Sequence, residues 1–261
     1  MTLNLMATSR NAVYLSGDFR LTREDTGAFT DNLDTQKLIP VIRLGWGALI
    51  AVTGIASFPP HIRDTVSWVL AKVNTIPMDG SFGSLPNALL EANAWLRKIP
   101  REVPLAFSIV GFVGQRPFMM AISNFSDLNG HMGRPSRQLR LFQHRPKHIE
   151  VRVAGDIDAI RSEEKEDLKR LLQQKADRQL IRENLAELNV RASQRSRLIS
   201  PECVTGYLLS SGLAEIGPHG IQDDEEYLPG FVISDFVKNG VAGFSIKYDE
   251  TERDYLRDGS G

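Results

Sequence analysis

The chain has 261 residues, of which 42% are hydrophobic and 24% are charged, a balance typical of a globular protein with its own buried core. The 31 Lys and Arg residues are matched by 32 Asp and Glu residues, which excludes a chain-wide attraction to nucleic acid or to anionic lipid. One cysteine excludes an internal disulfide framework, and no apolar run approaches the roughly 20 residues of a membrane-spanning helix. The first ten residues lack the features of a signal peptide, so we expect a cytoplasmic protein without a membrane partner.

The first part of the chain has the pattern of two β-hairpins. Residues 2–8 alternate, with Leu3 and Leu5 on one side and Asn4 and Met6 on the other. The run Ser16-Gly17-Asp18 is typical of the end of a hairpin, and a polar loop is expected at 22–36. The predicted hairpin strands are 2–8 with 13–15, and 38–41 with 48–52.

Three helical segments separate the later strands. Apolar side chains recur at helical spacing over 62–73 and over 85–96, and a longer helical block spans 162–192. Acidic residues fill the first turn of the long block, where the helix dipole favours them. The remaining predicted strands are 104–112, 118–122, 139–142, 149–153 and 204–209, with one or two more near Val232 and Phe244.

This order of elements predicts the fold class. Strands and helices come in separate runs rather than in βαβ alternation, which favours α+β architecture: antiparallel sheets covered by helices in a layered sandwich. We expect one domain over residues 1–217. The acidic segment 218–261 is then a C-terminal extension, and packing on the same domain is one alternative for it.

Thr2 carries the first indication of chemistry. Removal of the initiator Met1 is expected before a small residue, and it would leave a threonine with a free α-amine. The ordinary pKa of an α-amine is about 7.7–8.0, so this group can accept the proton of a neighbouring hydroxyl near neutral pH. A terminal threonine is therefore a candidate nucleophile with its own base.

Three segments then resemble, in order, the landmarks of proteasome β-type subunits, which are N-terminal-nucleophile hydrolases. Asp18-Phe19-Arg20 stands sixteen residues after Thr2, as the D-x-R of that family does. Lys37-Leu38-Ile39-Pro40-Val41 matches the family's lysine and following strand, and Thr53-Gly54-Ile55-Ala56 matches its small-residue turn. The resemblance implies a four-layer αββα sandwich of two antiparallel sheets flanked by helices. It extends to bacterial relatives, which include ancestral β-type subunits.

The resemblance also implies residue roles. Thr2 would be the nucleophile, the positive charge of Lys37 would favour its alkoxide, and Asp18 would hold that lysine in place. The backbone N–H of Gly54 would donate to the oxyanion, and either Ser200 or Asp156 would hydrogen-bond the terminal amine. A substrate pocket that prefers an apolar side chain before the scissile bond would be lined by Leu21, Val52 and Ala56.

Three departures from the family pattern leave an alternative open. The stretch 153–156 ends in Asp156 where active members carry a serine, and Arg197 stands where they carry an aspartate. The glycine pair expected after Ser200 is also missing. The chain is thus predicted to be a threonine peptidase or amidase of peptides or of smaller amides. Alternatively it is a catalytically inactive subunit with a structural or gating role.

Assembly follows from the same resemblance, which implies a homo-oligomer built as a ring or stacked ring. Trp68 and Trp95 would serve subunit contacts or lie in the domain core. The basic segment 134–148 is interpreted as an exposed hairpin edge or a subunit contact rather than a nucleic-acid site, because the net charge is close to zero. His144 and His148 flank Pro146, which breaks helical ligand spacing, so neither a metal nor another cofactor is predicted. Cys203 is expected to be buried.

Overall fold

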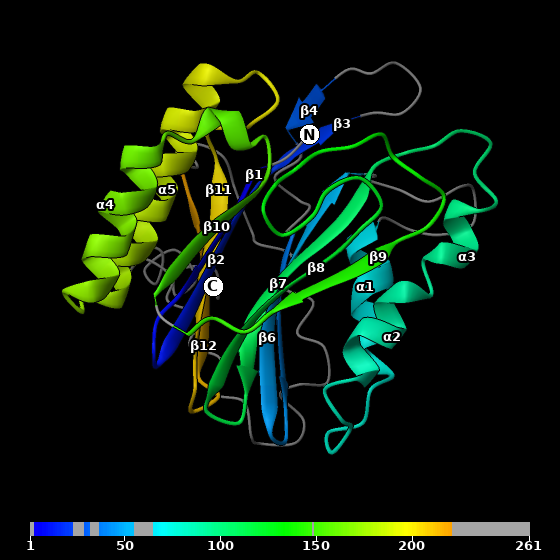
Figure 1. The fold of residues 1–261 in the computed structure, drawn as a ribbon, viewed down its shortest axis with the longest axis horizontal. Coiled ribbons are helices and arrows are strands. Elements are labelled where there is room, and N and C mark those ends of the chain that lie inside the picture. The colour runs from blue at the N-terminus through cyan, green and yellow to red at the C-terminus, as the bar shows by residue number, and fades with distance from the viewer. Residues whose placement is uncertain (1–2, 23–28, 32–36, 55–64, 148, 221–261) are drawn as a thin grey trace, which may run out of the picture.

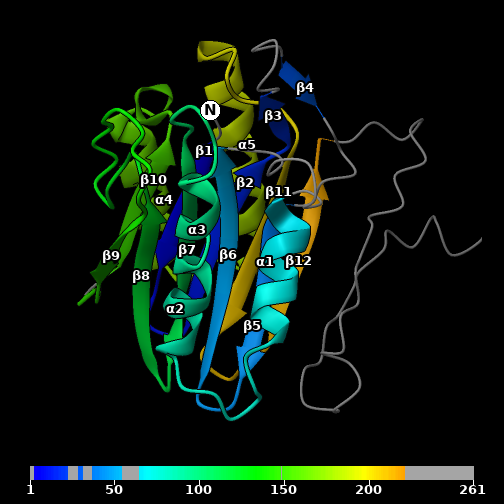
Figure 2. The ribbon, with the colours of Figure 1, turned by 90° about the vertical axis from the view of Figure 1, so that its right-hand side faces the viewer.

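Two antiparallel sheets are stacked face to face, and helices cover both outer faces (Figures 1 and 2). The computed structural model describes residues 3–22, 29–31, 37–54, 65–147 and 149–220. The predicted α+β fold class and the four-layer αββα arrangement are confirmed.

The first sheet is five-stranded, and its two central hairpin strands come from the beginning of the chain. In spatial order its strands are β10 (Glu150–Gly155), β1 (Leu3–Thr8), β2 (Ala12–Asp18), β11 (Cys203–Leu209) and β12 (Ala214–His219). The second sheet is also five-stranded and runs in simple chain order. It contains β5 (Leu38–Arg43), β6 (Trp46–Gly54), β7 (Leu105–Val113), β8 (Arg116–Ser123) and β9 (Arg140–His144).

The helices lie in two groups on opposite sides of the stacked sheets (Figure 1). The second sheet is covered by α1 (Thr65–Asn74), α2 (Ser84–Leu90) and α3 (Asn93–Leu96). The first sheet is covered by α4 (Ser162–Gln173) and α5 (Arg178–Arg195), with a short 3₁₀ turn at Ile157–Ala159 before them.

Three apolar clusters fill the three interfaces between these layers. One lies between α1–α3 and the second sheet, one between the two sheets, and one between the first sheet and α4–α5. Every residue of β1 is buried, because Leu3 and Leu5 face the helices while Met6 faces the other sheet. Burial on both faces explains why β1 forms a stable strand so close to the start of the chain.

Several predicted boundaries were wrong. The run Ser16-Gly17-Asp18 continues β2 instead of ending it, since it pairs with both β1 and β11. The expected loop 22–36 begins inside β3 (Arg20–Thr22), which pairs with β4 (Phe29–Asp31).

Two of the three predicted helical segments, 85–96 and 162–192, each form two helices. The segment 85–96 breaks after α2, where i→i−3 hydrogen bonds tighten the chain around Ala92 and Asn93 accepts a hydrogen bond from Leu139 N at 2.6 Å. The block 162–192 breaks at Lys175, which adopts φ +54°, and α5 restarts with the Asp177 side chain accepting from Gln179 N at 2.8 Å. Tertiary contacts and caps therefore decide breaks that apolar spacing does not reveal.

The remaining predictions concern burial and boundaries. Trp68 is buried and stacks on Phe107, while Trp95 is half-buried against the same cluster, which favours a core role for both tryptophans.

The strand β12 runs past the predicted domain boundary at 217 to His219, and the strands expected near Val232 and Phe244 lie outside the described residues. None of the described helices is both long enough and apolar enough to cross a membrane.

Candidate active site

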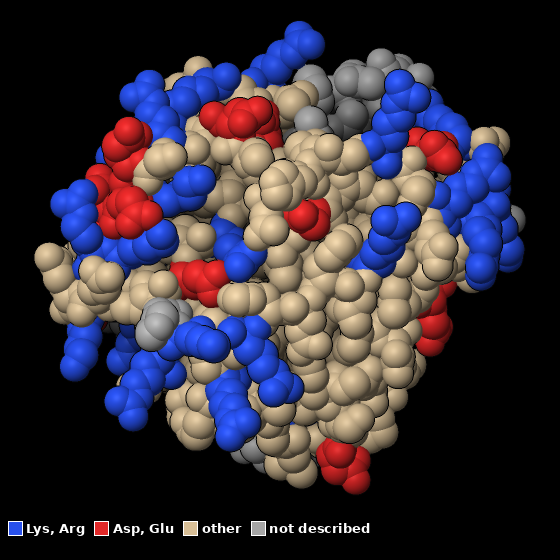
Figure 3. Space-filling model, viewed as in Figure 1, with Lys and Arg blue, Asp and Glu red and all other residues tan. Residues whose placement is uncertain are grey.

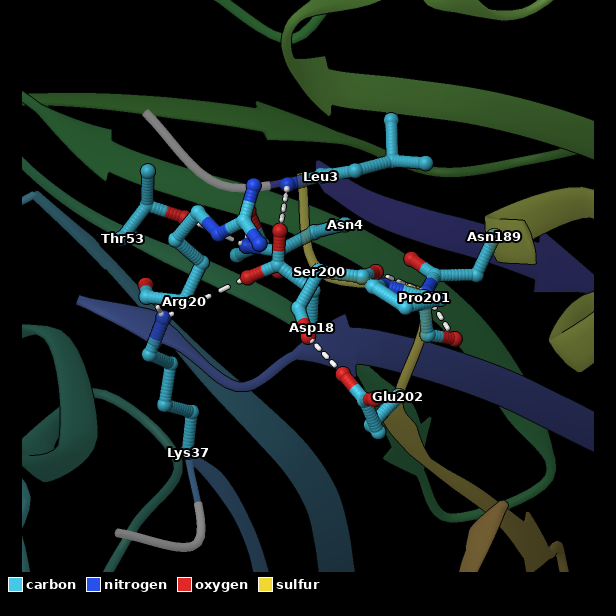
Figure 4. Close-up of polar contacts among 11 residues, drawn as sticks. Leu3, Asn4, Asp18, Arg20, Lys37, Thr53, Asn189, Ser200, Pro201 and Glu202 are labelled. Carbon is cyan, nitrogen blue, oxygen red and sulfur yellow. Dashed lines mark hydrogen bonds and ion pairs between the residues drawn. The ribbon is translucent and has the colours of Figure 1, made fainter. Parts of the chain in front are cut away.

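Asp18 lies at the last position of β2 and is fully buried. Its Oδ2 accepts a hydrogen bond from the backbone N–H of Leu3 at 3.2 Å, and its Oδ1 accepts one from Lys37 Nζ at 3.3 Å (Figure 4). The antiparallel pairing of Asn4 with Gly17 brings the start of β1 to this carboxylate. Asp18 therefore connects the lysine with the beginning of the chain.

Lys37 stands immediately before β5, and only 5% of its side chain is exposed. Its ammonium also donates to the backbone carbonyl of Arg20. The Lys37 carbonyl accepts from Val52 N at 3.1 Å, so the backbone at the lysine is fixed to β6. The structure thus brings the predicted Asp18 and Lys37 together as a buried ion pair.

Burial and neighbouring charge act in opposite directions on the pKa of Asp18. Burial raises the pKa of the Asp18 carboxyl, while the Lys37 ammonium and the Leu3 N–H lower it. The net direction is upward, which indicates that removing the carboxylate from water outweighs the attraction of one lysine. A buried pair of this kind is weak evidence for stability, and its place beside Leu3 makes it a candidate for a functional site.

Gly54 ends β6, and its position requires glycine. Its φ is +103°, and an added Cβ would lie 2.0 Å from the carbonyl oxygen of Pro104. Val52, two residues earlier, is buried against α1–α3 in the core of the second sheet. Of the other two predicted pocket residues, Leu21 lies in β3 with its side chain outside the description, and Ala56 lies outside the described residues. The predicted nucleophile Thr2 also lies outside them.

Ser200 is fully buried in the segment that leads into β11. Its hydroxyl donates to Glu202, and its carbonyl accepts from Asn189 Nδ2 at 2.7 Å. This segment runs beside the end of β2, since Phe19 N donates to the Glu202 carbonyl at 3.4 Å and Cys203 pairs with Asp18. Cys203 is itself fully buried, and burial raises the pKa of its thiol.

Asp156 ends the segment 153–156, where the family resemblance would place a serine. It follows Gly155, which pairs with Leu3, and its Oδ2 accepts a hydrogen bond from Ser196 Oγ at 2.6 Å. Arg197 contributes its backbone carbonyl, which accepts from Arg20. Asp156 and Arg197 therefore lie on segments that the structure brings to the end of the first sheet where Leu3 and Asp18 lie.

Sequence reasoning missed a second polar group beside the site. The Asn4 side-chain amide donates to Thr53 Oγ1 at 2.7 Å and to Ser108 Oγ at 3.1 Å across the space between the two sheets. The polar side of β1 was visible in its alternation. The partners of Asn4 on β6 and β7 could not be predicted, because periodicity shows which face of a strand a residue occupies but not which residues pack against that face.

Other charged features lie away from this site. A surface hollow of about 630 Å³ lies beside edge strand β10 and is lined by residues such as Arg152 and Lys165, but by none of the predicted site residues. The basic segment falls on and around edge strand β9, and Figure 3 shows Lys and Arg spread in several groups with Asp and Glu among them. His144 bonds Glu150 at 2.7 Å, and no group of three or more potential metal ligands occurs in the described part of the chain.

Solved structures of a proteasome-related protein share this fold. Anbu from Hyphomicrobium sp. strain MC1 aligns with a TM-score of 0.54 at 10% identity, over 86% of this chain and 89% of that chain. Anbu from Pseudomonas aeruginosa, described as a helical assembly, aligns with a TM-score of 0.54 at 12% identity, over 86% and 88% of the two chains. No protein-family model and no curated protein matches the sequence. Anbu, the ancestral β-subunit, has the N-terminal-nucleophile hydrolase fold, so the fold implied by the opening motif is confirmed.

Proposed function

We propose that this chain is an amide hydrolase that uses Thr2 as its nucleophile and the α-amine of Thr2 as general base. One observation carries the proposal: the buried pair of Asp18 and Lys37 is bonded to the backbone N–H of Leu3, the residue next to Thr2. A buried lysine held at this point supplies positive charge beside an attacking threonine oxygen.

The proposed reaction has two steps. Thr2 Oγ attacks the substrate carbonyl carbon while the α-amine takes the hydroxyl proton and passes it to the leaving amine, which departs as the C–N bond breaks. Water then attacks the resulting ester, with the same amine as base, and releases the acid and free Thr2. Lys37 favours the alkoxide, and the backbone N–H of Gly54 stabilises the oxyanion in both steps.

The proposed substrate is a peptide or a related amide with an apolar side chain before the scissile bond. Leu21, Val52 and Ala56 supply no charge for an acidic side chain to pair with, so cleavage after an acidic residue is expected to be slow. We further propose that the chain works as a homo-oligomer, because it shares its fold with a protein solved as a helical assembly.

A second candidate function is a non-catalytic subunit with a structural or gating role. The observation that favours it is the engagement of the polar groups near the site. The Ser200 hydroxyl donates to Glu202, and Asp156 accepts from Ser196, so both have partners other than an amine. Arg197 also replaces an acidic residue of the active pattern.

The test combines the intact mass of the purified full chain with covalent trapping. Loss of Met1 and an adduct with a peptide epoxyketone, which needs both the hydroxyl and the amine of Thr2, are expected for the hydrolase. Thr2→Ala serves as the negative control, and fluorogenic peptides with leucine or glutamate before the scissile bond test the apolar preference. A retained Met1 with no adduct would establish the non-catalytic alternative.

A further inference from the structure

Three polar side chains lie in the apolar layer between the two sheets. Asn4, Thr53 and Ser108 are exposed by 0%, 2% and 1%, and they come from β1, β6 and β7. Their neighbours in this layer are apolar side chains such as Met6 and Ala51. The Asn4 amide joins them, with its Nδ2 2.7 Å from Thr53 Oγ1 and 3.1 Å from Ser108 Oγ.

The contact between Asn4 and Thr53 joins two chain segments that both end at the candidate active site. Asn4 is two residues from Thr2, and Thr53 is bonded covalently to Gly54. Apolar contacts between stacked sheets carry little directional preference, so they allow small sliding movements. A hydrogen bond between side chains fixes distance and direction, and both hydroxyl partners can donate as well as accept, so the link holds in either orientation of the amide.

This arrangement lowers the stability of the folded state. Asn4 Oδ1 is buried and has no hydrogen-bond partner among the described residues, and it lies where an added Cβ on Gly17 would be only 3.2 Å away. Leaving a buried polar atom unpaired disfavours folding, and an apolar side chain of similar volume would avoid that loss. A buried amide in this position therefore indicates a role other than stability.

We propose that Asn4 is a positioning residue that sets the distance between the start of β1 and Gly54. The inference rests on the proposed function, in which Thr2 attacks the carbonyl and Gly54 N–H receives the oxyanion. Leu3, the residue after Thr2, begins β1 of the first sheet and Gly54 ends β6 of the second, so a link across the layer would keep the two groups in register. Asn4 acts on the reaction through Thr53, and Ser108, in the middle of β7, only anchors the other side of the amide.

The experiment compares two substitutions that each remove one partner of the same amide. Thr53→Val removes the hydroxyl next to Gly54, and Ser108→Ala removes the hydroxyl on β7. We expect Thr53→Val to lower kcat about 10- to 100-fold with KM changed less than about threefold, the loss expected from a small misplacement of a catalytic group. We expect Ser108→Ala to keep kcat within about twofold and Thr53→Ser, which retains the hydroxyl, to restore most of the activity.

The second measurement does not require hydrolysis. Amide hydrogen exchange of the peptide that contains Gly54 should become faster in Thr53→Val than in Ser108→Ala or Thr53→Ser. Equal losses of kcat in Thr53→Val and Ser108→Ala, or no loss in either, would overturn the inference. If the unaltered chain does not hydrolyse amides, the proposed function fails, and the exchange data alone decide whether Asn4 positions Gly54: equal exchange in Thr53→Val and Ser108→Ala rejects it.

Discussion

Two buried ion pairs each have their acidic partner in the first sheet, and they differ in where they lie and in what they connect. Asp18 and Lys37 meet at 3.3 Å at the end of β2, where each carboxylate oxygen accepts one hydrogen bond from the described residues. Arg182 of α5 and Glu215 of β12 meet at 2.6 Å, with 6% and 14% of their side chains exposed.

The Arg182 pair is embedded in a larger network. Arg182 Nε donates to Thr205 Oγ1 at 3.1 Å, and the second oxygen of Glu215 accepts from Tyr207 at 2.7 Å. Gly217 leaves room for the guanidinium, since an added Cβ would lie 2.3 Å from Arg182 Nη2. Extra hydrogen bonds of this kind are what allow a buried ion pair to compensate for its lost hydration.

The two ion pairs have different roles. The Arg182 network fixes edge strand β12 to α5 and the rest of the sheet, so its role is to hold structure. Burial raises the pKa of Asp18 even beside Lys37, and the contact that distinguishes this pair is the one with Leu3 at the start of β1. We therefore expect substitutions at the two pairs to affect different properties.

The largest expected effect is on catalysis. Lys37→Met keeps the aliphatic volume but removes the charge, and we expect it to lower kcat for peptide hydrolysis at least about 10³-fold, as for loss of an essential group of an activated nucleophile. Arg182→Met should keep kcat within about threefold of the unaltered chain, measured with the same fluorogenic peptide. An equal loss of activity in both variants would remove the distinction between the two pairs.

At the Arg182 pair the property expected to change is the free energy of unfolding. Arg182→Met leaves Glu215 partly buried without its cation, which should lower the free energy of unfolding by about 3–5 kcal/mol. Denaturant unfolding measures it, and Arg170→Met, which removes the exposed pair with Asp167, is the matched control with a change of at most about 1 kcal/mol. A loss below 1 kcal/mol in Arg182→Met would show that the network does not hold β12.

The two pairs also differ in how far the sequence predicts them. The first pair is predicted from the resemblance to proteasome β-type subunits, whose landmarks match Asp18 after Thr2 and Lys37 before its strand. Arg182 and Glu215 are 33 residues apart on a helix and an edge strand, and no local pattern joins them.

The same limit applies to the fold. Most strands follow from apolar periodicity and the four-layer order from the family resemblance, but β3 and β4 lie in a polar stretch that lacks such periodicity. The breaks between α2 and α3 and between α4 and α5 depend on caps and on contacts from distant segments. Asn4 is a further case, since its face is predictable and its partners across the sheets are not.

A pH dependence should arise from His219 in the Arg182 network. Burial, followed by the charge of Arg182, lowers the pKa of His219 from 6.5 to about 4, with Glu183 opposing this, and the ring bonds Thr205. The unfolded chain therefore binds a proton between about pH 6.5 and 4 that the folded chain does not, so stability is full above pH 6.5 and falls by up to about 3 kcal/mol as the pH drops to 4. Other groups titrate in both proteins, so the measurement is the difference between the unaltered chain and His219→Gln in denaturant unfolding at several pH values. Parallel curves would exclude His219 as the source.

The smallest expected effect tests most directly whether the Asp18–Lys37 pair stabilises the fold. Asp18→Asn combined with Lys37→Met removes both charges and keeps the side-chain volumes, so no buried charge is left unpaired. Because burial outweighs the attraction of Lys37 at Asp18, the double variant should unfold within about 1 kcal/mol of the unaltered chain or be more stable, and it should be more stable than Lys37→Met alone. Thermal and denaturant unfolding of the single and double variants measure this coupling. A loss of about 3 kcal/mol or more in the double variant would mean that Asp18 and Lys37 hold the end of β2 in place as Arg182 holds β12, and the reason for assigning them to chemistry would then disappear.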